Sequence, residues 1–307
     1  MKKDLRIIFM GTPDFAVPSL EVLVANNYNV VAVITAPDKP AGRGRKLQQS
    51  PVKECALKHN LTVLQPTNLK NPEFLEELKS YNANLQIVVA FRMLPVAVWD
   101  MPELGTFNLH GSLLPQYRGA APINWAIMNG ETETGVTTFF LRHEIDTGDM
   151  ILQKKEPIAD SDTVGDVYGR LMNIGGEAVL ETVKLIEEDK VNPIPQPMDV
   201  ELKSAPKIFK ETCEVDFSKT TKDVYDFIRG LSPYPAAWTE IEGVTYKLFN
   251  VEKVMDEKLE GDEKGYVTDN KTFFYIKTAD GYISVKNWQM QGKKRMDIEA
   301  FLRGKQF

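Results

Sequence analysis

Cysteine is scarce in this sequence of 307 residues, which contains only Cys55 and Cys213. Two cysteines so far apart do not make a disulfide framework, so we expect both thiols to be reduced. Cys55 and His59 have the i,i+4 spacing at which two helical side chains can share a metal ion. No other Cys or His is near them in the sequence, and we therefore expect no metal site.

Long apolar runs and nucleotide-binding glycine patterns are also lacking. No segment approaches the roughly 20 apolar residues that cross a bilayer, and residues 1–9 run directly into a strand pattern without a signal-peptide cleavage site. The sequence therefore predicts a cytoplasmic protein with no membrane partner. Residues 10–13 lack the three-glycine dinucleotide pattern and the Gly-Lys-Ser/Thr of a phosphate loop, so no nucleotide cofactor is expected.

Basic residues are outnumbered by acidic ones, and the net charge is −6. Residues 207–307 hold 17 Lys and Arg and 17 Asp and Glu residues, so the negative charge lies in the first 206 residues. Within that acidic part, Lys39, Arg43, Arg45 and Lys46 form a run without an acidic residue. Such a run is either a solvated loop or a surface that attracts a phosphate backbone.

Short apolar runs alternate with helical patterns in the first 190 residues. The predicted strands are 5–10, 30–35, 62–64, 85–91, 106–109, 136–141 and 150–154, and the predicted helices are 17–25, 51–58, 72–80 and 164–187. Because the strands are apolar throughout, both faces of the sheet should be covered by helices. This pattern predicts an α/β fold with a Rossmann-like, doubly wound, mostly parallel sheet in residues 1–190.

A second domain is expected after a linker. Residues 191–206 contain four prolines and cannot sustain a helix or a central strand. In residues 207–307, a helix at 222–231 precedes short alternating strands at 238–241, 245–254, 265–268, 272–277 and 282–289. Several short strands at this spacing predict a small OB-like β-barrel, a common platform for nucleic acids.

The residue pattern most typical of catalysis is Asn108 with His110. Two residues apart on a strand, their side chains share one face and can meet at one substrate atom. An amide donor beside an imidazole suits acyl transfer, because the amide stabilises an oxyanion and the imidazole handles protons near neutral pH. The alternative is structural: Asn108 would satisfy backbone groups at a strand end, and His110 would be an ordinary buried imidazole.

Four motifs around this pair resemble a known family. They are Asn108-Leu109-His110, Ser112-Leu113-Leu114-Pro115, Tyr117-Arg118-Gly119 and Ile145-Asp146-Thr147-Gly148. Together they resemble the 10-formyltetrahydrofolate-dependent formyltransferases. The segments at residues 11–15, 37–44, 50–53, 228–238 and 291–294 resemble the members of that family that act on methionyl-tRNA, so the resemblance covers essentially the whole chain.

The resemblance implies transfer of a formyl group from 10-formyltetrahydrofolate to the α-amino group of methionyl-initiator tRNA, for translation initiation. Asp146 would complete a catalytic set with Asn108 and His110. Without the resemblance, its local sequence indicates only a turn residue. The folate would contact Phe91, Met93, Leu94, Ser112, Leu113, Leu114 and Pro115, and the tRNA would contact Lys39, Arg43, Arg45 and Lys46. A monomer that uses no metal is expected, with residues 1–190 catalytic and residues 207–307 binding tRNA.

Two other functions remain open from the sequence. The same donor and catalytic residues could serve another acceptor, such as a sugar amine or water. A non-catalytic RNA-binding module would need only the barrel and the basic run, but it would leave Asn108, His110 and Asp146 without a role.

Overall fold

The computed structural model describes all residues except 1, 42–45, 198 and 256–264. The chain forms two compact units that exchange segments along the sequence. One unit comprises Met1–Gly119, Gly135–Glu156 and Tyr168–Lys203, and the other comprises Ala120–Thr134, Pro157–Val167 and Ser204–Phe307.

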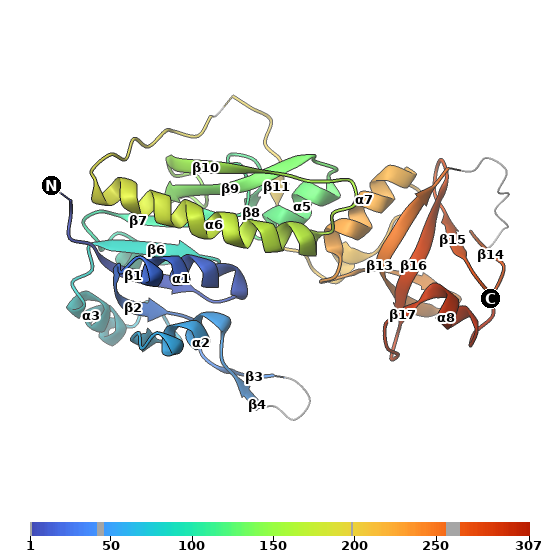
Figure 1. The fold of residues 1–307 in the computed structure, drawn as a ribbon, viewed down its shortest axis with the longest axis horizontal. Helices are drawn as coiled ribbons and strands as arrows, with labels where there is room; N and C mark the ends of the chain where they lie inside the picture. Colours follow the sequence, from blue (N-terminus) through green and yellow to red (C-terminus); the bar gives the residue numbers. More distant parts are fainter. Residues whose placement is uncertain (1, 42–45, 198, 256–264) are drawn as a thin grey trace. The chain divides into compact units, whose positions relative to one another are not determined.

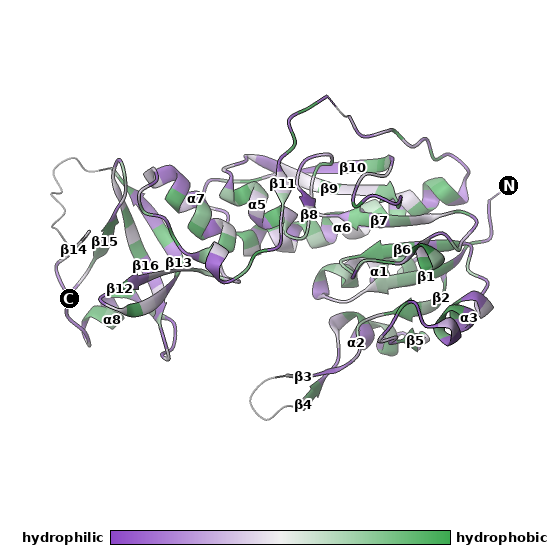
Figure 2. Ribbon diagram, turned by 180° about the vertical axis from the view of Figure 1, so that it is seen from behind, coloured by the Kyte–Doolittle hydropathy of each residue, from purple (hydrophilic) through white to green (hydrophobic). Residues whose placement is uncertain are grey.

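The first unit is built on a seven-stranded sheet with the strand order β10-β9-β7-β6-β1-β2-β5 (Figure 1). These strands are β1 (Arg6–Gly11), β2 (Asn29–Ile34), β5 (Val63–Leu64), β6 (Leu85–Val89), β7 (Thr106–His110), β9 (Glu133–Phe140) and β10 (Met150–Pro157). The five neighbouring strands β7, β6, β1, β2 and β5 pair in parallel, whereas β9 runs antiparallel to β7. Figure 2 shows β1, β2 and β6 mostly as hydrophobic, as expected for strands buried on both faces.

The helices of this unit begin where the local sequence favours a helix start. The helices α1 (Val17–Ala25), α2 (Pro51–Lys58) and α3 (Pro72–Ser80) have a proline in their first two positions, where a missing N–H breaks no helical hydrogen bond. Ser50 and Asn71 cap α2 and α3 by accepting a hydrogen bond from a first-turn N–H. These bounds, and those of α6 (Val164–Glu187), coincide with the predicted ranges.

Helices cover both faces of the sheet. Their contacts, together with the register of paired strands, show which face each strand residue occupies. Gly175 of α6 lies so near Leu109 that an added Cβ would be 2.8 Å from that side chain, and Thr182 of α6 hydrogen-bonds Thr138 of β9 at 2.7 Å. On the opposite face, Val88 packs in a cluster with residues of α3 and of the short helix α4 (Val96–Trp99). Because strand side chains alternate, Asn108 and His110 share this second face with Val88.

Smaller elements of the first unit escaped the sequence analysis. They are the 3₁₀ turn η1 (Asp14–Ala16), the short helix α4, and the hairpin strands β3 (Lys39–Ala41) and β4 (Lys46–Gln48). A further short strand, β8 (Arg118–Gly119), lies in this unit, and the short strand β11 (Ser204–Ala205) lies in the second unit. Strands of two or three residues carry too little periodicity for a sequence pattern to reveal them.

The second unit contains a curved antiparallel sheet with the strand order β12-β13-β16-β15-β14. Its elements are α5 (Pro122–Met128), η2 (Glu211–Cys213), α7 (Thr221–Leu231), β12 (Ala237–Ile241), β13 (Val244–Val254), β14 (Tyr266–Thr268), β15 (Phe274–Lys277), β16 (Tyr282–Met290), β17 (Met296–Asp297) and α8 (Ile298–Leu302). Aromatic residues fill its core, and Tyr246 stacks on the fully buried Trp288 at a centroid distance of 4.5 Å.

A buried ion pair fixes α7 within the second unit. Asp226 and Arg229 are both buried, and the Arg229 Nε donates to the Asp226 carboxylate at 2.7 Å. The same guanidinium donates to the carbonyl oxygens of Ala159 and Asp162, in the segment before α6. Removing Asp226 would leave the Arg229 charge buried without its carboxylate, which costs about 3–5 kcal/mol of folding free energy in comparable cases. Removing Arg229 would cost less, because Asp226 also accepts from the Lys222 ammonium at 2.6 Å.

The predicted fold class is confirmed. A mostly parallel Rossmann-like sheet is followed by a small antiparallel sheet. Its end strands β12 and β14 do not pair with each other in the described strand order, so this sheet is a half-barrel. Of the helices in the described part of the chain, none has both the length and the apolar character of a membrane span.

Candidate active site

The site is built around the carboxyl end of β7, where Asn108 and His110 point to the same face of the sheet. His110 is buried, whereas Asn108 is half-buried. Among the described residues, no group hydrogen-bonds the Asn108 carboxamide. A partly accessible amide donor without a protein partner can donate to a substrate oxygen.

Hydrogen bonding fixes the orientation and tautomer of His110. Its Nε2 lies 2.9 Å from the carbonyl oxygen of Tyr117, and because a carbonyl only accepts, Nε2 carries a proton. The other ring nitrogen, Nδ1, lies 3.9 Å from a carboxylate oxygen of Asp146. In the neutral ring Nδ1 is therefore the nitrogen without a proton, and it faces the Asp146 carboxylate.

Asp146 reaches His110 because the turn after β9 is tightly folded. Its backbone has φ 55°, and its carboxylate accepts a hydrogen bond from the N–H of Gly119 at 3.0 Å. Two residues later, Gly148 packs directly against the carbonyl oxygen of Phe140, where any Cβ would overlap. The sequence spacing gave no reason to join Asp146 to His110, but the structure brings the two together.

Gln196 supports this turn, and the sequence analysis missed it. It lies in the proline-rich segment after α6 but is buried. Its Nε2 donates to the carbonyl oxygens of Asp146 and Gly148 at 2.8 and 2.9 Å, and its Oε1 accepts from the Arg118 guanidinium. A lone glutamine among prolines gives no sequence signal, because its partners lie 48 to 78 residues away.

The segment after His110 is held by an internal hydrogen-bond network. Ser112 and Leu114 are buried, and the Ser112 hydroxyl donates to the Gln116 carbonyl at 2.7 Å. The Thr137 hydroxyl donates to the Ser112 carbonyl and accepts from the Leu114 N–H. Pro115 is buried as well, whereas Leu113 is half-buried. Of these four predicted folate contacts, Leu113 is therefore the side chain with most access to a ligand.

The other predicted folate residues follow β6. Leu94 belongs to the core cluster on the face of the sheet that carries Asn108, and Phe91 packs against that cluster. Met93 is 72% exposed. Between them, the Arg92 guanidinium donates to the carbonyl oxygens of Pro66 and Thr67, so its charge is directed to the loop after β5.

The predicted tRNA residues belong to the hairpin of β3 and β4, which Figure 1 shows projecting beside α2. Lys39 is exposed in β3 and Lys46 begins β4, while Arg43 and Arg45 lie outside the described residues. Asp38, at the base of the hairpin, accepts from Lys53 at 2.6 Å and from Gln65 at 2.8 Å. The hydrogen bond from Lys53 is the main reason that the pKa of the Asp38 carboxyl is lowered.

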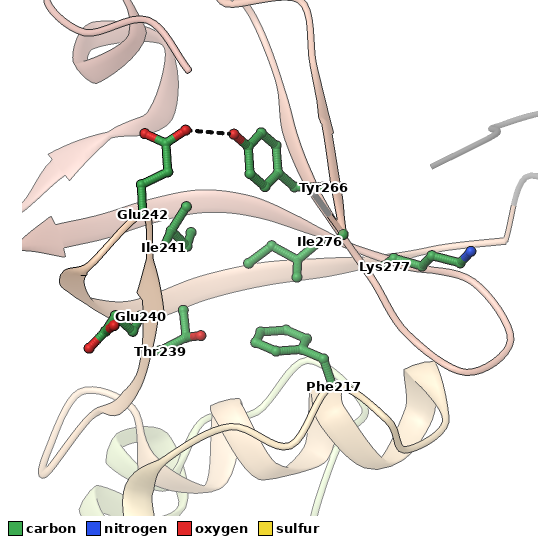
Figure 3. A pocket seen from close by; sticks show the side chains of 9 residues that line it. Phe217, Thr239, Glu240, Ile241, Glu242, Tyr266, Ile276 and Lys277 are labelled. Carbon is green, nitrogen blue, oxygen red and sulfur yellow. Dashed lines mark hydrogen bonds between the residues drawn. The ribbon is translucent and has the colours of Figure 1, made fainter. Parts of the chain in front are cut away.

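A cavity of about 520 Å³ lies in the second unit (Figure 3). It is lined by Phe217, Thr239, Glu240, Ile241, Glu242, Gly265, Tyr266, Ile276 and Lys277. Figure 3 shows the hydrogen bond of 3.0 Å by which Tyr266 donates to Glu242. None of the predicted catalytic or folate residues lines this cavity, and it is the opening between the two end strands of the half-barrel.

Comparison with family models gives two matches that together span most of the chain. Residues 5–183 match the model described as formyl transferase, and residues 207–306 match the model described as formyl transferase, C-terminal domain. The solved structures similar to this chain include an N-formyltransferase from Helicobacter canadensis in complex with folinic acid and dTDP-3-aminofucose. It is 21% identical, with a TM-score of 0.68, over 95% of this chain and 100% of that one.

HypX from Aquifex aeolicus in complex with tetrahydrofolic acid is 22% identical, with a TM-score of 0.65, over 98% of this chain and 47% of that one. Identities this low show a shared fold. Among curated proteins, the methionyl-tRNA formyltransferase of Bacteroides fragilis is 59% identical over 99% of this chain and 96% of its own length. That of Flavobacterium johnsoniae is 52% identical over 98% of this chain and 96% of its own length. The chain therefore belongs to the formyl transferase family.

Proposed function

We propose that the protein transfers a formyl group from 10-formyltetrahydrofolate to the α-amino group of methionine esterified to initiator tRNA. The observation that carries this proposal is the unpartnered Asn108 amide beside His110 on one face of β7. Relatives more than 50% identical over almost their whole length, named methionyl-tRNA formyltransferases, support the choice of donor and acceptor.

The proposed reaction is a single displacement. When bound, the folate supplies an activated formyl group, and the bond between the formyl carbon and the folate nitrogen N10 breaks as the bond to the methionyl amine forms. Asn108 donates a hydrogen bond to the formyl oxygen, which carries negative charge as the amine attacks. The amine loses one proton and N10 gains one, so no covalent bond to the protein is needed.

His110 and Asp146 have the proton-handling role in this proposal. The Tyr117 carbonyl holds Nε2 as a donor, so Nδ1 changes its protonation during the reaction. The Asp146 carboxylate, 3.9 Å from Nδ1, orients the ring and stabilises its charged form. These groups supply the oxyanion donor and the proton carrier, and the proposed reaction therefore uses no metal ion.

The folate contacts are proposed for Phe91, Met93, Leu94 and residues 112–115. Phe91 and Leu94 pack on the face of the sheet that carries Asn108, and Leu113 is the half-buried side chain of the loop that follows His110. These positions surround the carboxyl ends of β6 and β7, the edge at which open α/β sheets bind ligands.

For the tRNA, we propose contacts from Lys39, Arg43, Arg45 and Lys46 and from a C-terminal domain. The proposed domains are a catalytic domain of residues 1–190, a linker of residues 191–206 and an OB-like tRNA-binding domain of residues 207–307. The ranges of the two family matches support this division, although α5 packs with the C-terminal unit. We also propose that the protein acts as a cytoplasmic monomer.

The acceptor decides between this function and its alternatives. Incubation with 10-formyltetrahydrofolate and methionyl-initiator tRNA should give N-formylmethionine after mild deacylation, measured by mass spectrometry. A dTDP-linked amino sugar and buffer alone are the comparison acceptors. Formylation of the sugar, or hydrolysis of the donor at the same rate without tRNA, would contradict the proposal, and tRNA binding without any transfer would show a binding module.

His110→Ala and Asn108→Ala should lower turnover much more than tRNA binding. Loss of one oxyanion donor costs about 2.7–4 kcal/mol in studied enzymes, or roughly a hundred- to thousandfold in rate. Single-turnover rates at saturating substrates test this, with tRNA dissociation constants as the control. Near-normal rates in both variants would show that the roles are assigned wrongly.

Gln196→Ala should lower kcat by roughly 10- to 100-fold, because small displacements of catalytic groups have effects of this size. It removes the donor that holds the Asp146 turn and the acceptor that holds Arg118. Gln196→Glu keeps an acceptor for Arg118 and removes the donor, so it should show the same defect if the turn is what matters. Full kcat in both variants, measured at saturating folate and tRNA, would exclude this role.

Replacing Arg43 and Arg45 together by Ala should weaken tRNA binding and leave folate affinity unchanged. The logarithm of nucleic-acid affinity falls with the logarithm of salt concentration by about 0.9 per neutralised phosphate on B-form DNA, so the slope should flatten by roughly one to two units. The matched control replaces Lys70 and Lys79, two exposed lysines at or near α3, by Ala. Unaltered tRNA affinity with a raised KM for the folate would make the hairpin a folate lid instead.

A further inference from the structure

Glu21, Cys55 and His59 come together on the surface where α1 meets α2. A carboxylate oxygen of Glu21, the Cys55 Sγ and a ring nitrogen of His59 all lie within 4.8 Å of one another. Cys55 and His59 are one helical turn apart at the end of α2, and Glu21 lies on α1. The sequence analysis rejected a metal here because it found only two ligands, and the third comes from a different helix.

His59 has an unsatisfied ring nitrogen. Its Nε2 is buried, and no described residue hydrogen-bonds it. Burying a polar atom without a partner costs about 1–3 kcal/mol, so native proteins rarely leave one unpaired. The Cys55 side chain is also buried. A cation bound by this nitrogen would satisfy the imidazole, and the Cys55 thiolate could bind the same cation.

The donor set indicates which metal it would be. One thiolate, one imidazole and one carboxylate are the three side-chain types that bind Zn²⁺. In a tetrahedral site with bonds of about 2.0–2.3 Å, neighbouring ligand atoms are about 3.5 Å apart, so the cluster needs to contract by about 1 Å. The Glu21 side chain is 46% exposed and can make this movement.

The competing interaction at this place is weak. The Lys58 ammonium lies 3.6 Å from a Glu21 carboxylate oxygen, and both side chains are largely exposed. Exposed ion pairs of this kind contribute about 0–1 kcal/mol, so a divalent cation can displace Lys58 from Glu21.

We propose that Glu21, Cys55 and His59 bind one Zn²⁺ ion, with water as the fourth ligand, and that the ion joins α1 to α2. This site is separate from the reaction proposed above. Its effect would be structural, because Lys53 in the first turn of α2 binds Asp38 at the base of the β3–β4 hairpin.

Metal binding by the whole chain tests the proposal without using activity. After removal of metal with a chelator, Co²⁺ should bind once per chain and give a thiolate-to-cobalt charge-transfer band. Zn²⁺ should displace the cobalt and raise the Tm of the protein. Cys55→Ser and His59→Gln should each abolish the band and the rise in Tm, and Glu21→Gln should weaken Zn²⁺ binding at least tenfold.

Two control variants make the test specific. Cys213→Ser removes the other buried thiol, whose Sγ lies 3.2 Å from the Phe209 carbonyl oxygen, and it should leave the band and the Zn²⁺ affinity unchanged. Lys58→Ala should keep or strengthen binding, because it frees Glu21. If Cys55→Ser fails to fold, His59→Gln still decides. Zn²⁺ affinity in His59→Gln equal to that of the unaltered protein, or a band that depends on Cys213, would overturn the proposal.

Discussion

The carboxylate of Asp146 joins the three segments that make the site. It accepts the Gly119 N–H and faces His110 Nδ1, so the end of β7, the segment at β8 and the turn after β9 depend on one side chain. That turn keeps its shape only because Gly148 lets the chain pass against the Phe140 carbonyl. Gln196 also holds the turn, because its side-chain amide donates hydrogen bonds to two backbone carbonyls of the turn. The geometry of the proposed catalytic site therefore depends on backbone packing as much as on three side chains.

Strand alternation decides which residues of β7 are available for chemistry. Leu109 points to α6, where Gly175 lets the helix come close, and this leaves Asn108 and His110 on the other face. That face is closed over Val88 by α3 and α4, yet Asn108 remains half-buried and without a partner in the described chain. In the proposed reaction, the cost of leaving this amide without a partner is offset when a substrate oxygen accepts its hydrogen bond.

The sequence predicted well those features that depend on neighbours along the chain. The bounds of α1, α2 and α3 were predicted from helical patterns. The structure adds their physical reason, a proline in the first turn of each helix and Ser50 and Asn71 as caps of the last two. Features that depend on distant partners were missed. Gln196 was read as part of a linker because its partners are carbonyls near residue 147, and Glu21 was not linked to Cys55 and His59 because it lies on another helix. The helix α5 was also missed, since Ala121 at its N-cap offers no capping side chain.

Chemistry and acceptor choice are separable in this molecule. An amide donor, an imidazole and a carboxylate can serve the attack of any primary amine on a formyl group, so Asn108, His110 and Asp146 do not by themselves select a tRNA. Selection requires groups that recognise the remainder of the acceptor. The first 206 residues carry the net negative charge, which disfavours a phosphate backbone. The basic run from Lys39 to Lys46 is the exception, and Lys53 and Gln65 bind Asp38 at the base of its hairpin. We propose that this hairpin gives a polyanionic acceptor a favourable approach, because its run of basic residues lies within the acidic part of the sequence.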